Sequence, residues 1–186
     1  MSRKLPLAGI RITDMTTVVF GPYCTQVLAD LGADVVKVEA PEGDDTRKWG
    51  PPFVETAEGE IHAAAYFHGA NRGKRSITAD FRTEEGQALV RRLAGHADVV
   101  IENFKVGGLA KYGLDAASLR AQFPRLVYCS VTGFGSGEGA HLPGYDLVVQ
   151  AVGGLMSVTG SPESGRTTRV APLCSTSSFS SVPQMR

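Results

Sequence analysis

The sequence has no excess of either charge and no long apolar segment. Lys plus Arg and Asp plus Glu number 19 each, so the formal net charge is zero. A chain without a basic excess is not expected to have nucleic acid or an anionic membrane as its main partner. The N-terminal stretch MSRKLPLAGIRITDM lacks an apolar signal region, and no window is apolar for long enough to span a membrane.

Cysteine is scarce. Cys24, Cys129 and Cys174 are odd in number, far apart and in no spacing typical of metal ligands. Disulfide frameworks need paired cysteines and an oxidising compartment, so this usage favours a reducing cytoplasm. We therefore expect a soluble cytoplasmic protein, and its 186 residues are enough for one sizeable core.

Several cofactor motifs are also missing. No Gly-x-Gly-x-x-Gly follows the first expected strand, which removes the main support for an NAD or FAD site, and there is no Walker sequence. No His-x-x-x-His pair is present, and the scattered histidines are expected to be structural or solvated, namely His62, His68, His96 and His141. The sequence predicts neither a metal nor a redox cofactor.

What the sequence does contain is an alternation of short apolar runs and helical segments. We expect strands at 9–15, 33–39, 76–81, 97–103 and 125–135, and helices at 22–32, 83–96, 115–123 and 146–160. This pattern predicts an α/β fold, a doubly wound, Rossmann-like parallel sheet with helices on both faces. Ligands of such sheets bind at the carboxyl ends of strands, so the loops after Asp14, Glu39, Glu102 and Thr132 are the candidate site.

Two regions depart from the alternation. Residues 40–70 are rich in Gly, Pro and charge and are expected to form a long loop, of the kind that is functional or disordered. Beyond residue 170 the chain has five serines between Ser175 and Ser181 and no periodicity. Such composition is typical of an irregular tail. We therefore divide the chain into a domain at 1–170 and a serine-rich tail at 171–186.

Two short segments carry candidate ligand-binding residues. NRGKRS (71–76) has three cations within four positions, which suits phosphate, although a solvated loop is the alternative. ENF (102–104) ends an expected strand. There, Asn103 can hydrogen-bond a ligand and Phe104 can stack on a flat ring; the alternative is a turn-forming Asn and a core Phe.

A single carboxylate precedes the apolar helix expected after HLPGYD, residues 141–146. Aspartate is favoured before a helix because its side chain accepts hydrogen bonds from free backbone N–H groups, so Asp146 is a candidate cap. Carboxylates also act as nucleophiles in covalent catalysis, so Asp146 is equally a candidate catalytic residue. The local residues fit either interpretation.

Taken together, several segments resemble the family III CoA-transferases (CaiB/BaiF type), the group that includes formyl-CoA and carnitine CoA-transferases. In the expected order they are LAGIRITDMT (7–16), LADLGADVVKVEAPEGDDTR (28–47), NRGKRSI (71–77), ADVVIENF (97–104) and GYDLVVQAVGGLMSVTG (144–160). The stretch GDDTRKWGPPFV (43–54) is most similar to the branch that uses dicarboxylic acids such as succinate and glutarate.

The resemblance implies a covalent reaction at Asp146. Its carboxylate attacks an acyl-CoA thioester to give an aspartyl anhydride and CoA thiolate, and the thiolate then forms an enzyme–CoA thioester and releases the donor acid. An acceptor acid regenerates an anhydride, and CoA returns to it. CoA is a substrate in this scheme, and no metal or other cofactor is required.

The resemblance also implies a CoA site. Val19 and Phe20 are expected near the thioester end. The remaining residues implied to contact CoA are Asn71, Arg72, Lys74, Arg75, Asn103, Phe104, Lys105 and Lys111.

Three positions differ from some relatives. This chain has Ala40 where some members have arginine, and Val19 where some use glutamine near the acyl group. Related α-methylacyl-CoA racemases have a histidine at the position of Tyr145, where it serves in proton transfer. Its absence favours a transferase over a racemase.

The resemblance further implies that family members are longer, dimerise as interlocked rings, and cover the active site with a glycine-rich loop from the second half. We therefore expect the N-terminal part of such an enzyme, whose substrates are an acyl-CoA and a small carboxylic acid. The alternatives are a non-catalytic CoA-binding remnant that needs a partner for the missing half, or a racemase relative.

Overall fold

The computed structural model describes residues 4–159 and 178–179. The chain divides into two compact units, Met1–Ser130 and Val131–Arg186, and each is described by itself. The predicted boundary at residue 170 lies outside the described residues.

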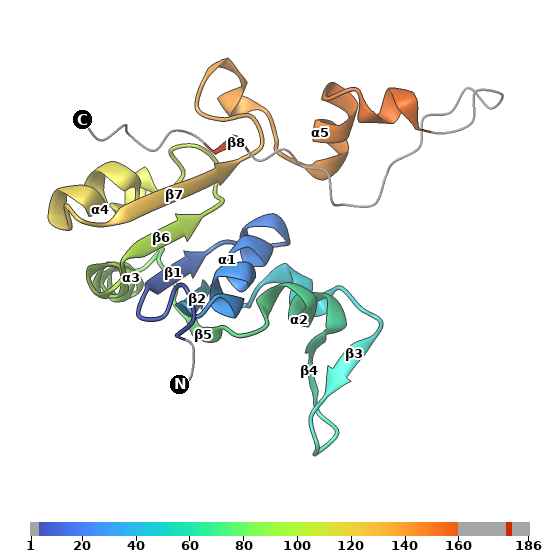
Figure 1. The fold of residues 1–186 in the computed structure, drawn as a ribbon, viewed down its shortest axis with the longest axis horizontal. Coiled ribbons are helices and arrows are strands. Elements are labelled where there is room, and N and C mark those ends of the chain that lie inside the picture. The colour runs from blue at the N-terminus through green and yellow to red at the C-terminus, as the bar shows by residue number, and fades with distance from the viewer. Residues whose placement is uncertain (1–3, 160–177, 180–186) are drawn as a thin grey trace. The chain divides into compact units, whose positions relative to one another are not determined.

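The first unit alternates strands with helices (Figure 1). Its parallel strands are β1 (Arg11–Met15), β2 (Asp34–Glu39), β5 (Arg75–Thr78), β6 (Val99–Glu102) and β7 (Val127–Thr132), the last of which continues into the second unit. Its helices are α1 (Phe20–Asp30), α2 (Ala65–Asn71), α3 (Glu84–His96) and α4 (Ala116–Gln122), with 3-10 turns η1 (Asp45–Lys48) and η2 (Ala110–Tyr112).

The strands lie in the order β5-β2-β1-β6-β7, and every neighbouring pair is parallel. The chain starts in the middle of the sheet, winds outward through β2 to β5, and then returns to the other side of β1 to form β6 and β7. Right-handed crossovers put α1 and α2 on one face and α3 and α4 on the other (Figure 1). The predicted α/β class is confirmed, and the winding direction reverses between β1 and β6.

The main apolar core lies between the sheet and α3 and α4. Its fully buried members include Met15, Val90, Val100 and Leu119, and burying a side chain of this size contributes roughly 2 kcal/mol. Helix α3 begins as predicted, because the Thr83 hydroxyl accepts a hydrogen bond from the Gly86 N–H at 3.1 Å.

The long loop predicted at 40–70 is instead structured. It contains η1, the antiparallel hairpin β3 (Phe53–Glu55) and β4 (Ile61–Ala64), and then α2. The hairpin turn is closed by the Thr56 N–H donating to the Glu60 carbonyl at 2.8 Å, and Gly59 supplies a φ of 83°. These elements are too short to show a clear hydrophobic period, so composition alone predicted a loop.

The second unit contains the end of β7, η3 (Glu138–His141), α5 (Asp146–Val152), η4 (Leu155–Val158) and β8 (Ser178–Phe179). β8 pairs antiparallel with the last two residues of β7, so part of the predicted irregular tail forms a short strand. The predicted helix at 146–160 is interrupted after Val152, where Gly154 adopts a φ of 77°. Left-handed glycine is a common helix terminator. Among the described residues, no helix has the length and apolarity needed to cross a membrane.

Candidate active site

The loops after β1 and β6 meet at the point where the sheet reverses its winding direction. Asn103 follows β6, and its side-chain oxygen accepts a hydrogen bond from the Thr17 N–H at 2.9 Å. Its side-chain nitrogen donates to the Thr17 carbonyl, also at 2.9 Å. We call this pair of hydrogen bonds between the Asn103 side chain and the Thr17 backbone the Asn103 clasp. In open α/β sheets ligands usually bind in the crevice at this position, so the Asn103 clasp lies where a site is expected.

The turn between β1 and α1 is strained. Val18 has a φ of 72°, in the left-handed region that a β-branched residue rarely adopts. Such a conformation costs about 1–3 kcal/mol and persists only where the surroundings impose it. The next residue, Val19, is the N-cap of α1 and provides no side-chain capping bond. Val19 and Phe20, both half-buried, therefore follow directly from a constrained turn.

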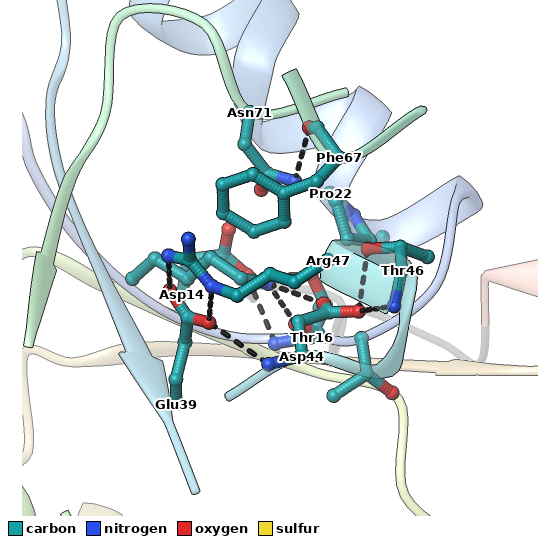
Figure 2. A network of polar contacts seen from close by, with 12 residues as sticks. Asp14, Thr16, Pro22, Glu39, Asp44, Thr46, Arg47, Phe67 and Asn71 are labelled. Carbon is teal, nitrogen blue, oxygen red and sulfur yellow. Dashed lines mark hydrogen bonds and ion pairs between the residues drawn. The ribbon is translucent and has the colours of Figure 1, made fainter. Parts of the chain in front are cut away.

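A network of buried charges underlies this edge of the sheet (Figure 2). On β1, the fully buried carboxylate of Asp14 accepts hydrogen bonds from the Thr16 and Thr25 hydroxyls at 2.5 and 2.6 Å. The same carboxylate forms an ion pair with Lys74 at 3.0 Å. The residue before β5 is thereby tied to the end of β1.

A second buried ion pair joins β2 to the loop that follows it. The Lys37 ammonium lies 2.9 Å from an Asp44 carboxylate oxygen and donates to the Thr16 carbonyl at 2.7 Å. The other Asp44 oxygen accepts from the backbone N–H of Thr46 at 3.0 Å, which caps η1. Because Lys37 reaches both the Thr16 carbonyl and Asp44, it fixes the loops after β1 and β2 together.

A third pair lies at the end of β2. Glu39 accepts two hydrogen bonds from the Arg47 guanidinium, both at 2.7 Å, and another from the Ser76 hydroxyl. Burial raises the pKa of Glu39, but the hydrogen bonds from Arg47 and Ser76 outweigh it and hold this pKa at about 2. The guanidinium lies 3.8 Å from the centroid of the Phe67 ring, and Figure 2 shows this ring stacked against it.

The sequence interpretation did not identify this network as part of the site. A charged residue inside the apolar run ADVVKVE was the available signal, since a lysine on a strand covered on both faces must have a partner. Breaking one buried pair typically costs 3–5 kcal/mol, because the remaining charge is left uncompensated. The network therefore rigidly positions the loops at the carboxyl ends of β1 and β2.

The structure separates the three cations of NRGKRS. The Lys74 side chain is only 2% exposed, and its ammonium donates to Asp14, to the Pro22 carbonyl and to the Asn71 side-chain oxygen. Burial lowers the pKa of Lys74, and the Asp14 charge opposes that effect. Lys74 is thus buried and links Asp14, Pro22 and Asn71, whereas the arginines on either side of it are exposed.

Arg72 and Arg75 face solvent. Arg72 forms an ion pair with Asp30 at 2.6 Å, and Arg75 forms one with Asp34 at 2.7 Å. Their side chains are 63% and 69% exposed, so both remain accessible to an anionic ligand.

The segment after β6 has a half-buried and an exposed part. Phe104 packs against the core and meets Phe81 edge-on at 5.5 Å, which is the contact expected of a core phenylalanine. Lys105 and Lys111 are exposed, and the Lys111 ammonium lies 4.8 Å from the centroid of the Tyr112 ring. Contact of these residues with a ligand stays a prediction.

A cavity of about 260 Å³ opens beside the network. It is lined by Lys37, Arg47, His62, Phe67, His68, Asn71, Lys74 and Ser76. The two histidines, expected to be structural or solvated, stack with their ring nitrogens 3.3 Å apart. Burial lowers the pKa of His68, and the charges of His62 and Arg47 lower it further. The lining of this cavity includes the cationic side chains of Lys37, Arg47 and Lys74 and the aromatic ring of Phe67.

In the second unit, Asp146 is the first residue of α5. Tyr145 holds the cap position and makes no side-chain capping bond. Asp146 is half-buried, and one of its carboxylate oxygens accepts a hydrogen bond from the side-chain nitrogen of the buried Gln150 at 2.7 Å. A carboxylate in the first turn of a helix is favourably placed toward the positive end of the helix dipole. The cap position predicted for Asp146 is therefore occupied by its neighbour.

The doubly wound parallel sheet places this chain among the α/β proteins, in which ligands bind at the carboxyl ends of the strands. The model of CoA-transferase family III matches residues 7–177. The chain belongs to CoA-transferase family III.

Proteins similar to this chain are named as CoA-transferases or as members of the CaiB/BaiF family. The succinate–glutarate CoA-transferase of Agrobacterium fabrum is 62% identical over 164 residues, which are 87% of this chain and 41% of that protein. The mouse succinyl-CoA:glutarate CoA-transferase is 45% identical over 162 residues, 86% of this chain and 36% of the relative. A CaiB/BaiF family crystal structure from Brucella suis superposes with a TM-score of 0.85 at 58% identity, covering 91% of this chain and 44% of that one. The chain thus spans about two fifths of the length of these relatives.

Proposed function

We propose that the chain is the N-terminal part of a CoA-transferase, which moves CoA from an acyl-CoA thioester to an acceptor carboxylic acid. The supporting observation is the family match, which runs through the Gly-Tyr-Asp segment to residue 177. Relatives named for succinate, glutarate and mesaconate point to dicarboxylic acids as the substrate class. The full-length protein is proposed to act as a cytoplasmic homodimer.

Asp146 is the proposed nucleophile. One of its carboxylate oxygens attacks the thioester carbonyl, the C–S bond breaks, and CoA leaves as a thiolate from an aspartyl–acyl anhydride. The thiolate then attacks the aspartyl carbonyl, which gives an enzyme–CoA thioester and the free donor acid. The acceptor carboxylate repeats these steps in reverse, and this division into smaller steps is the advantage of covalent catalysis.

Two neighbours of Asp146 support this assignment. The hydrogen bond from Gln150 at 2.7 Å orients the carboxylate, so that attack does not require its reorganisation. Tyr145 is 73% exposed and occupies the position at which racemases have a histidine. Tyrosine lacks the imidazole that serves in the proton transfer of the racemases, which favours a transferase over a racemase.

The first unit supplies the proposed CoA site. Four exposed cations are proposed to meet the phosphates, namely Arg72, Arg75, Lys105 and Lys111. Val19 and Phe20 are proposed to pack near the thioester end of CoA. Asn71 and Phe104 are proposed to line the rest of the CoA site, and Lys74 positions Asn71 through a hydrogen bond to its side-chain oxygen. CoA is a substrate of the proposed reaction, and none of its steps, as written above, calls for a metal or redox cofactor.

A second candidate function follows from the coverage of the relatives. Since the chain corresponds to 41% of the Agrobacterium fabrum protein, it is also a candidate CoA-binding component that turns over only with a partner that supplies the remainder. For the chain by itself, this candidate predicts CoA binding without covalent chemistry at Asp146.

Trapping of the covalent intermediate tests the proposal. The protein is incubated with succinyl-CoA and then with hydroxylamine, and peptides are analysed by mass spectrometry. A hydroxamate at Asp146 is expected, and it should vanish in Asp146→Asn while the circular dichroism spectrum is retained. Asp115→Asn, which changes another aspartate at a helix start, is the matched control and should leave trapping intact.

The other outcomes separate the alternatives. Calorimetric binding of CoA that is unchanged in Asp146→Ala, together with no hydroxamate in the wild type, would favour the binding component. Deuterium incorporation at the α-carbon of a branched acyl-CoA would instead favour the racemase.

A further inference from the structure

The side chain of Asn103 is engaged at both ends by one residue. Its oxygen accepts from the Thr17 N–H and its nitrogen donates to the Thr17 carbonyl, each at 2.9 Å. This arrangement imitates one step of strand pairing, made by a side chain across the loops after β1 and β6. The amide that sequence considerations assigned to a ligand is thus bonded to the protein itself.

The residue after this clasp needs external support. Val18 has a φ of 72°, and relaxation to a negative φ would redirect the chain that leads into α1. On the N-terminal side of the clasp, Thr16 is fixed by Asp14 and Lys37. On the C-terminal side, α1 begins at Phe20 without a side-chain cap. The Asn103 clasp therefore lies at the junction between the fixed part of the turn and its strained part.

We infer that Asn103 is a positioning residue, which acts on the thioester through the Thr17–Val18 turn and not through an amide contact with CoA. By holding Val18 in its left-handed conformation, it fixes the positions of Val19 and Phe20. The inference rests on the proposed function, in which these two residues pack near the thioester end.

The direct-contact alternative makes different predictions. If the Asn103 amide binds CoA directly, its removal should lower the affinity for CoA and leave the Thr17–Val18 turn unchanged. If the amide instead positions the turn, its removal should disturb the turn and slow the reaction of bound substrate. The affinity for CoA should change less, because the nucleotide end of CoA does not contact Val19 or Phe20 in the proposed arrangement.

The experiment compares five forms of the chain, namely wild type, Asn103→Ala, Asn103→Asp, Val18→Gly and the double variant Asn103→Ala/Val18→Gly. In Asn103→Ala, we expect exchange of the Thr17 amide hydrogen, followed by NMR, to accelerate about tenfold. Asn103→Asp retains the acceptor for this N–H and should restore most of its protection. Gln122→Ala removes an exposed amide that bonds the Ser118 carbonyl and is the matched control without effect on Thr17.

Two further readouts are not expected from a merely structural amide. The rate of hydroxamate formation at saturating succinyl-CoA should fall about tenfold in Asn103→Ala, while the dissociation constant for CoA stays within about twofold. Adding Val18→Gly should recover most of that rate, because glycine adopts the left-handed conformation without strain.

The urea midpoint extends the test to a chain that does not turn over. Asn103→Ala should lower the midpoint less in the Val18→Gly background than in the wild type, since the clasp then holds an unstrained residue. Additive midpoints, or unchanged Thr17 exchange with a tenfold weaker CoA affinity, would overturn the inference. A wild type that forms no hydroxamate refutes the proposed function instead, and the exchange and midpoint data still decide the role of Asn103.

Discussion

Replacing Arg47 by methionine removes the cation from a partly buried ion pair and keeps an apolar side chain against Phe67. The Glu39 side chain, which is 3% exposed, would retain only the Ser76 hydroxyl and the Asp44 N–H as donors. A pKa lowered from 4.5 to about 2 corresponds to roughly 3 kcal/mol of folding free energy at neutral pH. Arg47, Ser76 and Asp44 share this contribution, and Arg47 is the largest of the three. Because removal of Arg47 also leaves the Glu39 charge without its partner, we expect Arg47→Met to lower the free energy of unfolding by about 3 kcal/mol at pH 7.

This loss should depend on pH in a defined direction. The pKa of Glu39 is lowered in the folded state, so its contribution to stability is complete above 4.5 and disappears as the pH falls toward about 2. In the variant, the pKa of Glu39 rises, and that contribution is already missing at pH 7. The difference between the two proteins should consequently shrink as the pH is lowered from 5 toward 3.

Urea unfolding monitored by circular dichroism between pH 7 and pH 3 measures this difference. Arg82→Met is the control, because Arg82 is 62% exposed in its pair with Asp80 and such pairs contribute only about 0–1 kcal/mol. A double-mutant cycle with Glu39→Gln should assign most of the loss to the pair. If Arg47→Met costs no more than Arg82→Met, or costs the same at pH 3 as at pH 7, the assignment of the stabilising energy to the Glu39–Arg47 pair is wrong.

Two further predictions concern packing and thiol reactivity. A Cβ at Gly21 would lie 2.4 Å from the Thr16 Cβ, so Gly21→Ala should lower the free energy of unfolding in urea by about 1–3 kcal/mol. A Cβ at Gly69 would meet nothing within 4 Å, so Gly69→Ala should leave this free energy unchanged or raise it by up to about 1 kcal/mol. Burial raises the pKa of Cys24 and of Cys129, so alkylation at pH 7, followed by peptide mass spectrometry, should be at least about tenfold slower at both than in urea; equal rates would contradict their burial.

The sheet was predictable because its strands are marked by physics that acts locally. Runs such as ADVVIEN are apolar on both faces, and the Thr83 cap gives the start of α3. The hairpin β3–β4 was not predictable, since three- and four-residue strands carry too few side chains to show a period. The interruption of the helix at 146–160 was foreseeable in principle from its paired glycines.

The site was predictable at the level of segments and less so at the level of side chains. Residues 71–76 do lie beside the sheet edge, but spacing could not show that Lys74 points inward while Arg72 and Arg75 face solvent. The inward direction depends on Asp14, sixty positions away in the sequence. Likewise, the clasp of Asn103 on Thr17 depends on the order of strands in the sheet, which residue types at one position do not encode.

The depth at which the charges lie has a consequence for work in different salt concentrations. Ions in solution weaken attractions between exposed charges and hardly affect pairs from which water is excluded. Lys37, Lys74 and Asp14 should therefore hold the loops equally well in dilute buffer and in molar salt. The electrostatic attraction of the exposed Arg72 and Arg75 for a polyphosphate should be largely lost over the same range of salt concentration. A salt titration of CoA affinity would thus report on the outer cations of a scaffold that stays unchanged.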